Sequence, residues 1–158
     1  MTRPYTAFNF AVSILLGDGS TDPLCDAAFA ECSGLEVTHE VTTIREGGSN
    51  NRPIHLRGPV SYGTLALQRG MTADIGLWRW MDRVTRDDGA HLRATCQVDL
   101  LASDRSATVA TFVLRGCVPT KLTAPTLDAQ SGLVALEELE IAYELLTLEP
   151  VTGGGAGA

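Results

Sequence analysis

The stretch FNFAVSILL, residues 8–16, decides the fold class of this chain. Large apolar residues occupy every second position in it, namely Phe8, Phe10, Val12, Ile14 and Leu16. A period of two places successive side chains on opposite faces, so the stretch predicts a β-strand with one buried face. The glycines and polar residues of Gly17–Ser20 follow directly and predict a turn at the end of this strand.

The same alternation recurs after residue 34. One side of this second predicted strand carries Leu35, Val37, His39 and Val41, and the other carries Glu36, Thr38, Glu40 and Thr42. We expect the apolar side to be buried, with His39 as a packed histidine rather than a metal ligand. Arg45–Pro53 is dense in glycine, asparagine and charge, and it predicts a long exposed loop.

Further strands are predicted at residues 54–56, 64–68, 97–101 and 108–114, with a turn at residues 102–105. Thr72–Arg86 differs, because its apolar residues recur at helical spacing. We expect one amphipathic helix there, with Thr72 as its cap, Asp74 in its first turn, Arg83 and Arg86 near its end and Gly89 closing it. We interpret Trp78 and Trp80 as packing residues rather than a ligand platform.

Leu133–Leu148 fits two patterns. As a helix it aligns Leu136, Leu139, Tyr143 and Leu146; as a strand it opposes apolar residues to Glu138, Glu140 and Glu144. Periodicity alone does not choose between the two.

The composition excludes several classes of protein. The chain has 158 residues, with 12 Lys and Arg against 19 Asp and Glu, a net charge of −7. Phosphate-neutralising nucleic-acid binders need clustered basic residues, so we expect no sequence-specific nucleic-acid partner. No apolar run approaches the roughly 20 residues of a transmembrane helix, and the first residues lack a signal-peptide core. We expect folding in a cytoplasm without membrane insertion, as one domain over 1–150 with a flexible Gly/Ala-rich tail at 151–158.

Catalytic and metal-binding patterns are weak. Cys25 and Cys32 are seven residues apart, Cys96 and Cys117 stand alone in the sequence, and the three histidines form no ligand motif. No nucleophile elbow, Walker loop or dinucleotide fingerprint occurs. We therefore expect no enzyme, cofactor or metal site. A small ligand-binding β-barrel and a metal hydrolase that uses the cysteines and histidines stay as alternatives.

Short motifs follow one another in a specific order. They are FxFxV at 8–12, FxExSGL at 29–35, REGG at 45–48, LRG at 56–58, LxLxRG at 65–70, LWxW at 77–80, VPxK at 118–121, PxLxA at 125–129 and AxEELE at 135–140. Together they resemble the tail tube protein family of contractile-tailed phages and related contractile injection systems. Gly17–Ala28 is longer than the family pattern, and Thr111-Phe112 and Ala142–Glu144 stand where the family tends to have tryptophan and histidine.

The resemblance implies a mainly β fold, an antiparallel β-sandwich or barrel with one α-helix, and it implies a strand for Leu133–Leu148. It further implies hexameric rings that stack into a hollow inner tube, assembled in the bacterial cytoplasm as part of a virion or injection particle. The implied partners are other copies of the chain, a sheath protein, baseplate or spike and terminator proteins, and cargo or a tape-measure protein in the lumen. A tube-initiating or adaptor ring at the baseplate, or a ring of the type VI secretion kind, is the alternative within this superfamily.

The resemblance also suggests site residues. The candidate interface between subunits or rings comprises Arg45, Glu46, Gly47, Gly48, Arg52, Arg57, Gly58, Arg69 and Gly70. We expect Arg57-Gly58 and Arg69-Gly70 to terminate strands near it. Glu138, Glu140 and Glu144 would form an acidic strand that faces either the lumen or the sheath.

Overall fold

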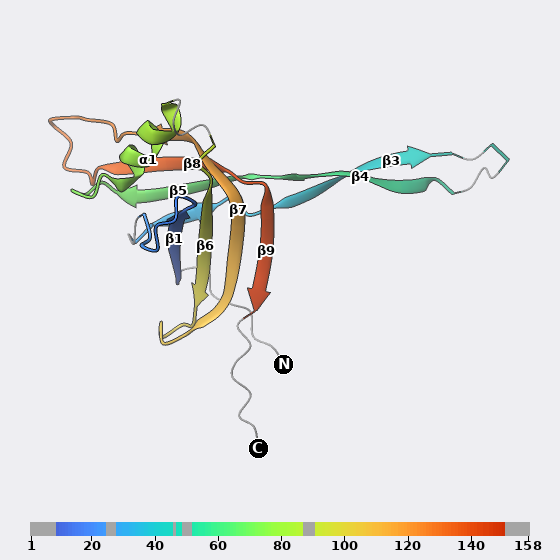
Figure 1. Cartoon of the computed structure of the whole chain (residues 1–158), viewed down its shortest axis with the longest axis horizontal. Helices are drawn as coiled ribbons and strands as arrows, with labels where there is room; N and C mark the ends of the chain where they lie inside the picture. The colour runs from blue at the N-terminus through green and yellow to red at the C-terminus, as the bar shows by residue number, and fades with distance from the viewer. Residues whose placement is uncertain (1–8, 25–27, 46, 49–51, 87–90, 151–158) are drawn as a thin grey trace, which may run out of the picture.

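The computed structural model describes residues 9–24, 28–45, 47–48, 52–86 and 91–150, and its strands and single described helix are shown in Figure 1. In chain order the elements are β1 (Phe10–Leu16), β2 (Glu31–Ser33), β3 (Val37–Ile44), β4 (Ile54–Tyr62), β5 (Thr64–Gly70), α1 (Gly76–Thr85), β6 (Ala94–Leu101), β7 (Thr108–Thr123), β8 (Leu136–Ala142) and β9 (Leu145–Pro150). Every strand pairing is antiparallel. The predicted fold class is confirmed.

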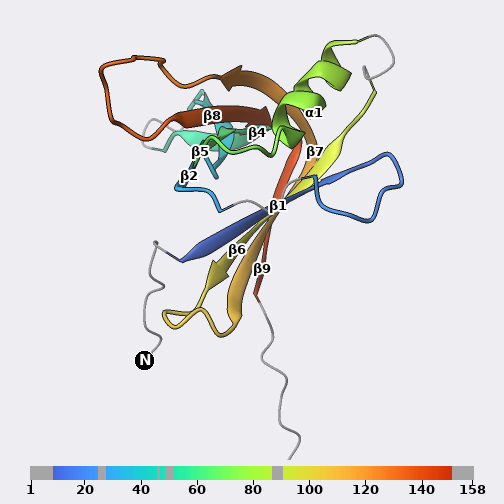
Figure 2. The same ribbon diagram turned by 90° about the vertical axis from the view of Figure 1, so that its left-hand side faces the viewer.

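The long strand β7 belongs to two halves of the sheet. Its first part pairs with β6 and β9, and its last part, from Val118, pairs with β8. One half therefore contains β1, β6, β7 and β9, and the other contains β2, β5, β8 and the end of β7. Figure 2 shows the two halves crossing at a steep angle. The bend falls at Gly116, whose φ of +68° suits glycine because it has no Cβ.

The core lies between these two halves and under α1. Val12, Ile14 and Leu16 of β1 are 3%, 0% and 8% exposed, which confirms the buried face predicted from residues 8–16 for the described part of that stretch. Apolar side chains of β5, β6, β7, β8 and α1 also belong to the core, among them Leu65, Leu67, Leu139, Ile141, Leu77 and Trp80. The packing role predicted for Trp80 is therefore confirmed.

Helix α1 begins later than predicted. Its N-cap is Ile75, so neither Thr72 nor Asp74 lies in it. The hydroxyl of Thr72 instead accepts a hydrogen bond from the Asp74 amide at 3.2 Å, and the Asp74 carboxylate accepts one from the Gly76 amide at 2.9 Å. These local bonds hold residues 72–75 in a turn that competes with helix. Arg83 lies in the last turn as predicted; Gly89 lies outside the described residues.

The ambiguous C-terminal segment forms strands, as the resemblance implies, but there are two of them rather than one. β8 and β9 are separated at Tyr143 and Glu144, where the Glu144 amide donates to the Arg115 carbonyl at 2.9 Å. This interruption lies opposite the bend of β7, so both strands turn the corner together. Among the described helical residues, none form a segment long and apolar enough to span a membrane.

Candidate functional site

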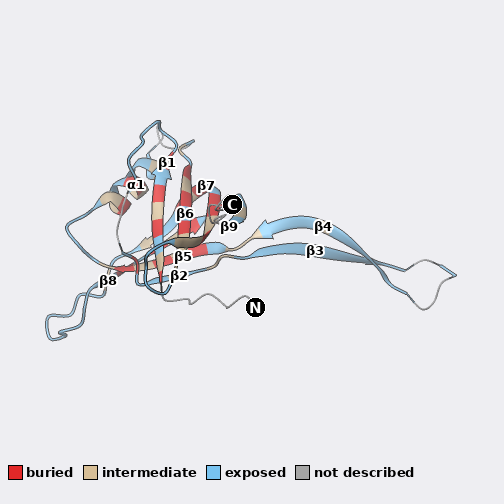
Figure 3. Ribbon diagram, turned by 90° about the horizontal axis from the view of Figure 1, so that it is seen from below, coloured by how far each residue is buried: buried red, intermediate tan, exposed pale blue. Residues whose placement is uncertain are grey.

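The hairpin of β3 and β4 extends far from the rest of the protein (Figures 1 and 3). Every residue of β3 is exposed, and in β4 only Gly58 and Tyr62 are partly buried. The prediction that Leu35–Thr42 has a buried apolar side is therefore wrong for Val37 and Val41, and His39 is not packed in the core. β3 and β4 pair only with each other. They form a two-stranded ribbon, and both of its faces are exposed to solvent.

Much of the predicted loop Arg45–Pro53 forms the tip of this hairpin. Arg45, Gly47, Gly48 and Arg52 are exposed there, whereas Glu46 lies outside the described residues. A Cβ added to Gly47 or Gly48 would contact nothing within 4 Å. The tip therefore has room for larger side chains within the protomer.

Arg57 and Gly58 lie in the middle of β4, so the prediction that they terminate a strand is wrong. The register shifts between His39 and Val41, opposite this part of β4. A Cβ on Gly58 would lie 3.0 Å from the Glu40 carbonyl, so glycine fits the close approach at this bulge.

The outer part of the hairpin carries an unpartnered apolar face. The register pairs Ile44 with Ile54 and Thr42 with Leu56, which places these side chains on one face of the ribbon. Ile44, Ile54 and Leu56 are 43%, 41% and 47% exposed. We call these three residues the hairpin apolar face. Exposed apolar patches of this kind mark interaction surfaces.

Tyr143 fixes the root of the hairpin. Its hydroxyl donates to the Gly34 carbonyl at 2.7 Å and accepts from the Glu36 amide at 3.1 Å. The centre of its ring lies 5.6 Å from the centre of the Tyr62 ring, and Tyr62 is the last residue of β4. Gly34 has a φ of +90°, and a Cβ there would lie 1.8 Å from the Thr64 carbonyl oxygen. The root is therefore closely packed, in contrast to the tip. Sequence reasoning missed this role of Tyr143, because its partners are more than 100 residues away.

Gly70 ends β5 as predicted, but Arg69 lies inside the protomer, with 1% of its side chain exposed. Its guanidinium pairs with the carboxylate of Glu137 and donates to the Asp74 carbonyl at 2.9 Å. The Trp78 indole donates to the same Glu137 carboxylate at 2.9 Å. Because these contacts hold the Arg69 side chain inside the protomer, we treat its role as structural and do not include it in the proposed interface.

The three candidate glutamates do not form one row. Glu138 and Glu140 lie on the outer face of β8, where Glu138 accepts a hydrogen bond from Gln68 at 3.0 Å. Glu144 lies at the corner after β8, with its carboxylate 3.9 Å from the Arg93 guanidinium. The interruption at Tyr143 separates it from the strand. Register adds Glu31 of β2 to the face of Glu138, because both pair with Gln68.

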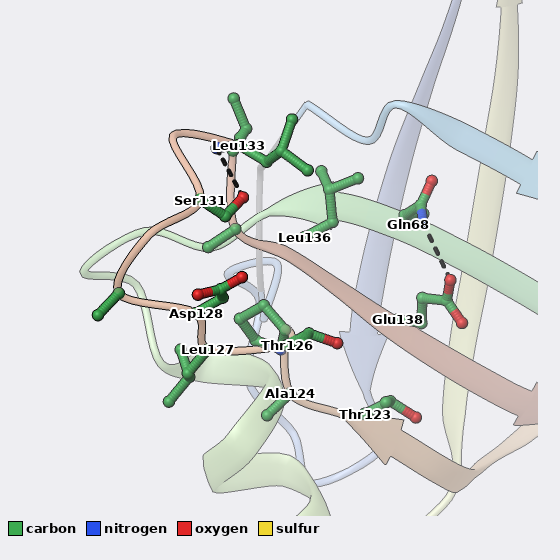
Figure 4. Close-up of a pocket in the computed structure, with 14 residues that line it drawn as sticks. Gln68, Thr123, Ala124, Thr126, Leu127, Asp128, Ser131, Leu133, Leu136 and Glu138 are labelled. Carbon is green, nitrogen blue, oxygen red and sulfur yellow. Dashed lines mark hydrogen bonds between the residues drawn. The ribbon is translucent and has the colours of Figure 1, made fainter.

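A groove lies beneath the loop between β7 and β8, at the end of this acidic face (Figure 4). It encloses about 870 Å³ and is lined by residues of the loop together with Gln68, Leu136 and Glu138. Leu127 and Leu133 of the loop are 87% and 88% exposed. Sequence analysis did not predict this groove.

The cysteines that the structure describes are free thiols. Cys96 and Cys117 are buried near each other, and a hydrogen bond from Cys96 lowers the pKa of Cys117. Burial raises the pKa of Cys32 to about 11, so its reactive thiolate form is scarce at neutral pH. Within the described ranges, no three His, Cys, Asp or Glu side chains gather into a group that could hold a metal ion.

Among the described strands, the seven-stranded sheet has four open edges. Of the described strands, β1 and β9 bound one half of the sheet, and β2 and the end of β7 bound the other. Open edges present unpaired N–H and C=O groups, which recruit further strands.

The family model described as "T4-like virus tail tube protein gp19" matches residues 6–147. A chain in a cryo-EM structure of the anti-feeding prophage (AFP) baseplate, 6-fold symmetrised, is 33% identical over 96% of this chain and 99% of its own, with a TM-score of 0.83. No curated protein matches the chain.

Two more distant structures show the same fold. A chain of the PVC extracellular contractile injection system, from its sheath-tube complex in the extended state, is 19% identical over 94% of this chain and 93% of its own, with a TM-score of 0.78. Hcp1 from Flavobacterium johnsoniae is 15% identical over 89% of this chain and 95% of its own, with a TM-score of 0.51. The extent of the family match and the 33% identical relative show that this chain belongs to the tail tube protein family, a family of structural proteins rather than enzymes.

Proposed function

We propose that this chain is the repeating subunit of the inner tube of a contractile injection particle, in which six copies form a ring and rings stack into a hollow tube. The observation that carries the proposal is the β3–β4 hairpin, which exposes Ile44, Ile54 and Leu56 far from the protomer's own core. Full burial of one such side chain stabilises a contact by about 1.5–3 kcal/mol, so contact with another copy removes the cost of exposing them.

Ring closure uses the open strand edges. β2 and the end of β7 bound the half-sheet that contains β5 and β8, so neighbouring copies can extend it edge to edge. The outer face of this half-sheet then lines the channel, because α1 and the core cover its other face. Glu31, Glu138 and Glu140 outnumber Lys121, which lies opposite Glu140 on the same face, so this surface has a net negative charge. That charge disfavours adhesion of DNA or acidic cargo in the lumen.

The particle and its other partners follow from the relatives. The AFP and PVC chains come from baseplate and sheath-tube structures, which supports a sheath and a baseplate as partners of this chain too. The 33% identical chain comes from a baseplate structure, and this favours a second candidate function, a tube-initiating ring. Such a ring forms hexamers without extending into long tubes.

Replacement of the hairpin apolar face tests the proposal. Ile44→Thr/Ile54→Thr/Leu56→Thr places β-branched threonine, which favours strands, at all three positions, so we expect a folded protomer that forms no tubes in electron micrographs. Matched substitutions in the same hairpin nearer its root, Thr38→Ser and Ser61→Thr, control for disturbance of the ribbon. Normal tubes from the triple variant would contradict the proposed role of the hairpin.

The channel assignment has its own test. Glu140→Lys reverses a charge in the middle of the acidic face, and we expect normal tubes with altered cargo content. Normal cargo content combined with loss of sheath attachment would place this face outside the tube.

A further inference from the structure

The hairpin and the loop at residues 124–135 project from opposite ends of the protomer. In Figure 1 the hairpin extends to one side along the longest axis, and the orange loop between β7 and β8 extends to the other; Figure 3 shows the same arrangement from below. The register explains this, because the hairpin root adjoins the Thr64–Ala142 end of the β5–β8 pair, and the loop adjoins the Gly70–Leu136 end. A hairpin cannot reach the loop of its own chain.

The groove under this loop has an apolar rim. Leu127, Leu133 and Val134 are 87%, 88% and 77% exposed, so the loop, like the hairpin, presents apolar side chains that the protomer does not cover. Figure 4 shows Leu127 and Leu133 projecting from the loop and Leu136 lying on the neighbouring strand. The volume of about 870 Å³ is large enough for several side chains of a partner.

The charges of the two surfaces are complementary. Asp128 and Glu138 are the charged residues that line the groove. Arg45 and Arg52 flank the hairpin apolar face, one following Ile44 and the other preceding Ile54 by two positions. Both surfaces therefore combine exposed apolar side chains with charges, and for the described residues these charges have opposite sign.

We propose that the groove under the 124–135 loop is the docking site for the hairpin of a second copy of this chain in the next ring. The proposal rests on the proposed tube function and names the surface that receives the hairpin. Ile44, Ile54 and Leu56 pack against Leu127, Leu133 and Val134, while Arg45 and Arg52 lie near Asp128 and Glu138. Because the two surfaces differ and lie at opposite ends, the contact is heterologous and repeats from ring to ring without closing.

A charge swap tests the pairing. The hairpin variant is Arg45→Glu/Arg52→Glu, the groove variant is Asp128→Arg/Glu138→Arg, and the combined variant carries all four changes. Arg79→Glu and Asp22→Lys reverse exposed charges elsewhere and serve as matched controls. Tube number and length are measured in negative-stain micrographs, and circular dichroism and thermal unfolding verify that each variant folds.

We expect the hairpin and groove variants each to give at least about tenfold fewer tubes, since repulsion recurs at every subunit of each ring contact. The combined variant restores tubes, and the controls assemble normally. Normal tubes from the groove variant would overturn the proposal and assign the groove to another occupant, such as a cargo peptide. Loss of tubes that the combined variant does not restore would also overturn the pairing. If the unaltered protein forms no tubes, the proposed function itself fails.

Discussion

Arg69 of β5 and Glu137 of β8 lie directly opposite each other in the sheet and form an ion pair with 1% and 2% of their side chains exposed. The Trp78 indole donates a hydrogen bond to the Glu137 carboxylate, and the Asp74 carbonyl accepts one from the Arg69 guanidinium. The guanidinium also lies 5.9 Å from the centre of the Phe29 ring. The pair therefore joins two strands to the turn and helix that cover the core.

Removal of one charge from this pair should destabilise the protomer strongly. Arg69→Met leaves the Glu137 carboxylate buried without its counter-ion, and we expect a loss of about 3–5 kcal/mol in the free energy of unfolding. Urea denaturation of dissociated protomers measures it. Arg69→Met/Glu137→Leu removes both charges and should recover most of the loss; a double variant as unstable as the single one would contradict this account.

Tyr143→Phe should loosen the hairpin root while the core stays folded. The variant removes the hydroxyl that bonds to Gly34 and Glu36 and keeps the ring beside Tyr62, so we expect a loss of about 1–3 kcal/mol. Amide exchange at Glu36 should accelerate, and tube yield should fall more than the stability change alone explains. Tyr62→Phe keeps the ring contact and serves as the control. Unchanged exchange at Glu36 would show that the hydroxyl does not hold the root.

Two glycines of the hairpin region should respond in opposite ways to substitution. Gly34→Ala places a Cβ 1.8 Å from the Thr64 carbonyl oxygen in a left-handed conformation, so we expect a loss of roughly 3 kcal/mol or more. Gly47→Leu meets open space in the protomer and should leave its melting temperature unchanged. Tube assembly should nevertheless be lost, because in the proposed tube the tip lies against another copy. Normal tubes from Gly47→Leu would show that the tip does not lie in the interface.

Cys32 should be alkylated slowly. A pKa of about 11 leaves little thiolate at pH 8, and the stronger nucleophilicity of that thiolate only partly compensates, so we expect a rate roughly tenfold below that of an ordinary exposed cysteine. Mass spectrometry of the Cys32 peptide after iodoacetamide treatment measures this rate, with unfolded protein as the reference. The rate should rise as the pH approaches 11. A rate equal to that of the unfolded chain would show that burial does not protect the thiol.

Much of the fold could be predicted from local pattern. The period of two in β1 reports a buried face directly, and the same holds for the core-facing residues of β5 and β8. The hairpin shows where this reasoning fails. β3 alternates apolar and polar residues like a core strand, yet both of its faces are exposed. An apolar face that meets another copy has the same sequence pattern as one that meets the protomer's own core.

The contacts that hold the site together leave no local signal. Tyr143 fixes Gly34 and Glu36 across more than 100 residues, and Arg69 meets Glu137 across 68. The resemblance predicts an interface role for Arg69, but an Arg-Gly pair at a strand end is as compatible with burial as with exposure. Thr72 illustrates a smaller error, since its hydroxyl stabilises a turn before α1 instead of capping the helix.

Negative-stain electron microscopy of the purified, unaltered protein, with size-exclusion chromatography beside it, tests the central claim most directly. The account predicts sixfold rings that stack into hollow tubes, in a proportion that rises with protein concentration. Rings that never stack would favour the tube-initiating role over the main tube subunit. A strictly monomeric particle at every concentration, with the hairpin exposed to solvent, would contradict self-assembly of this chain.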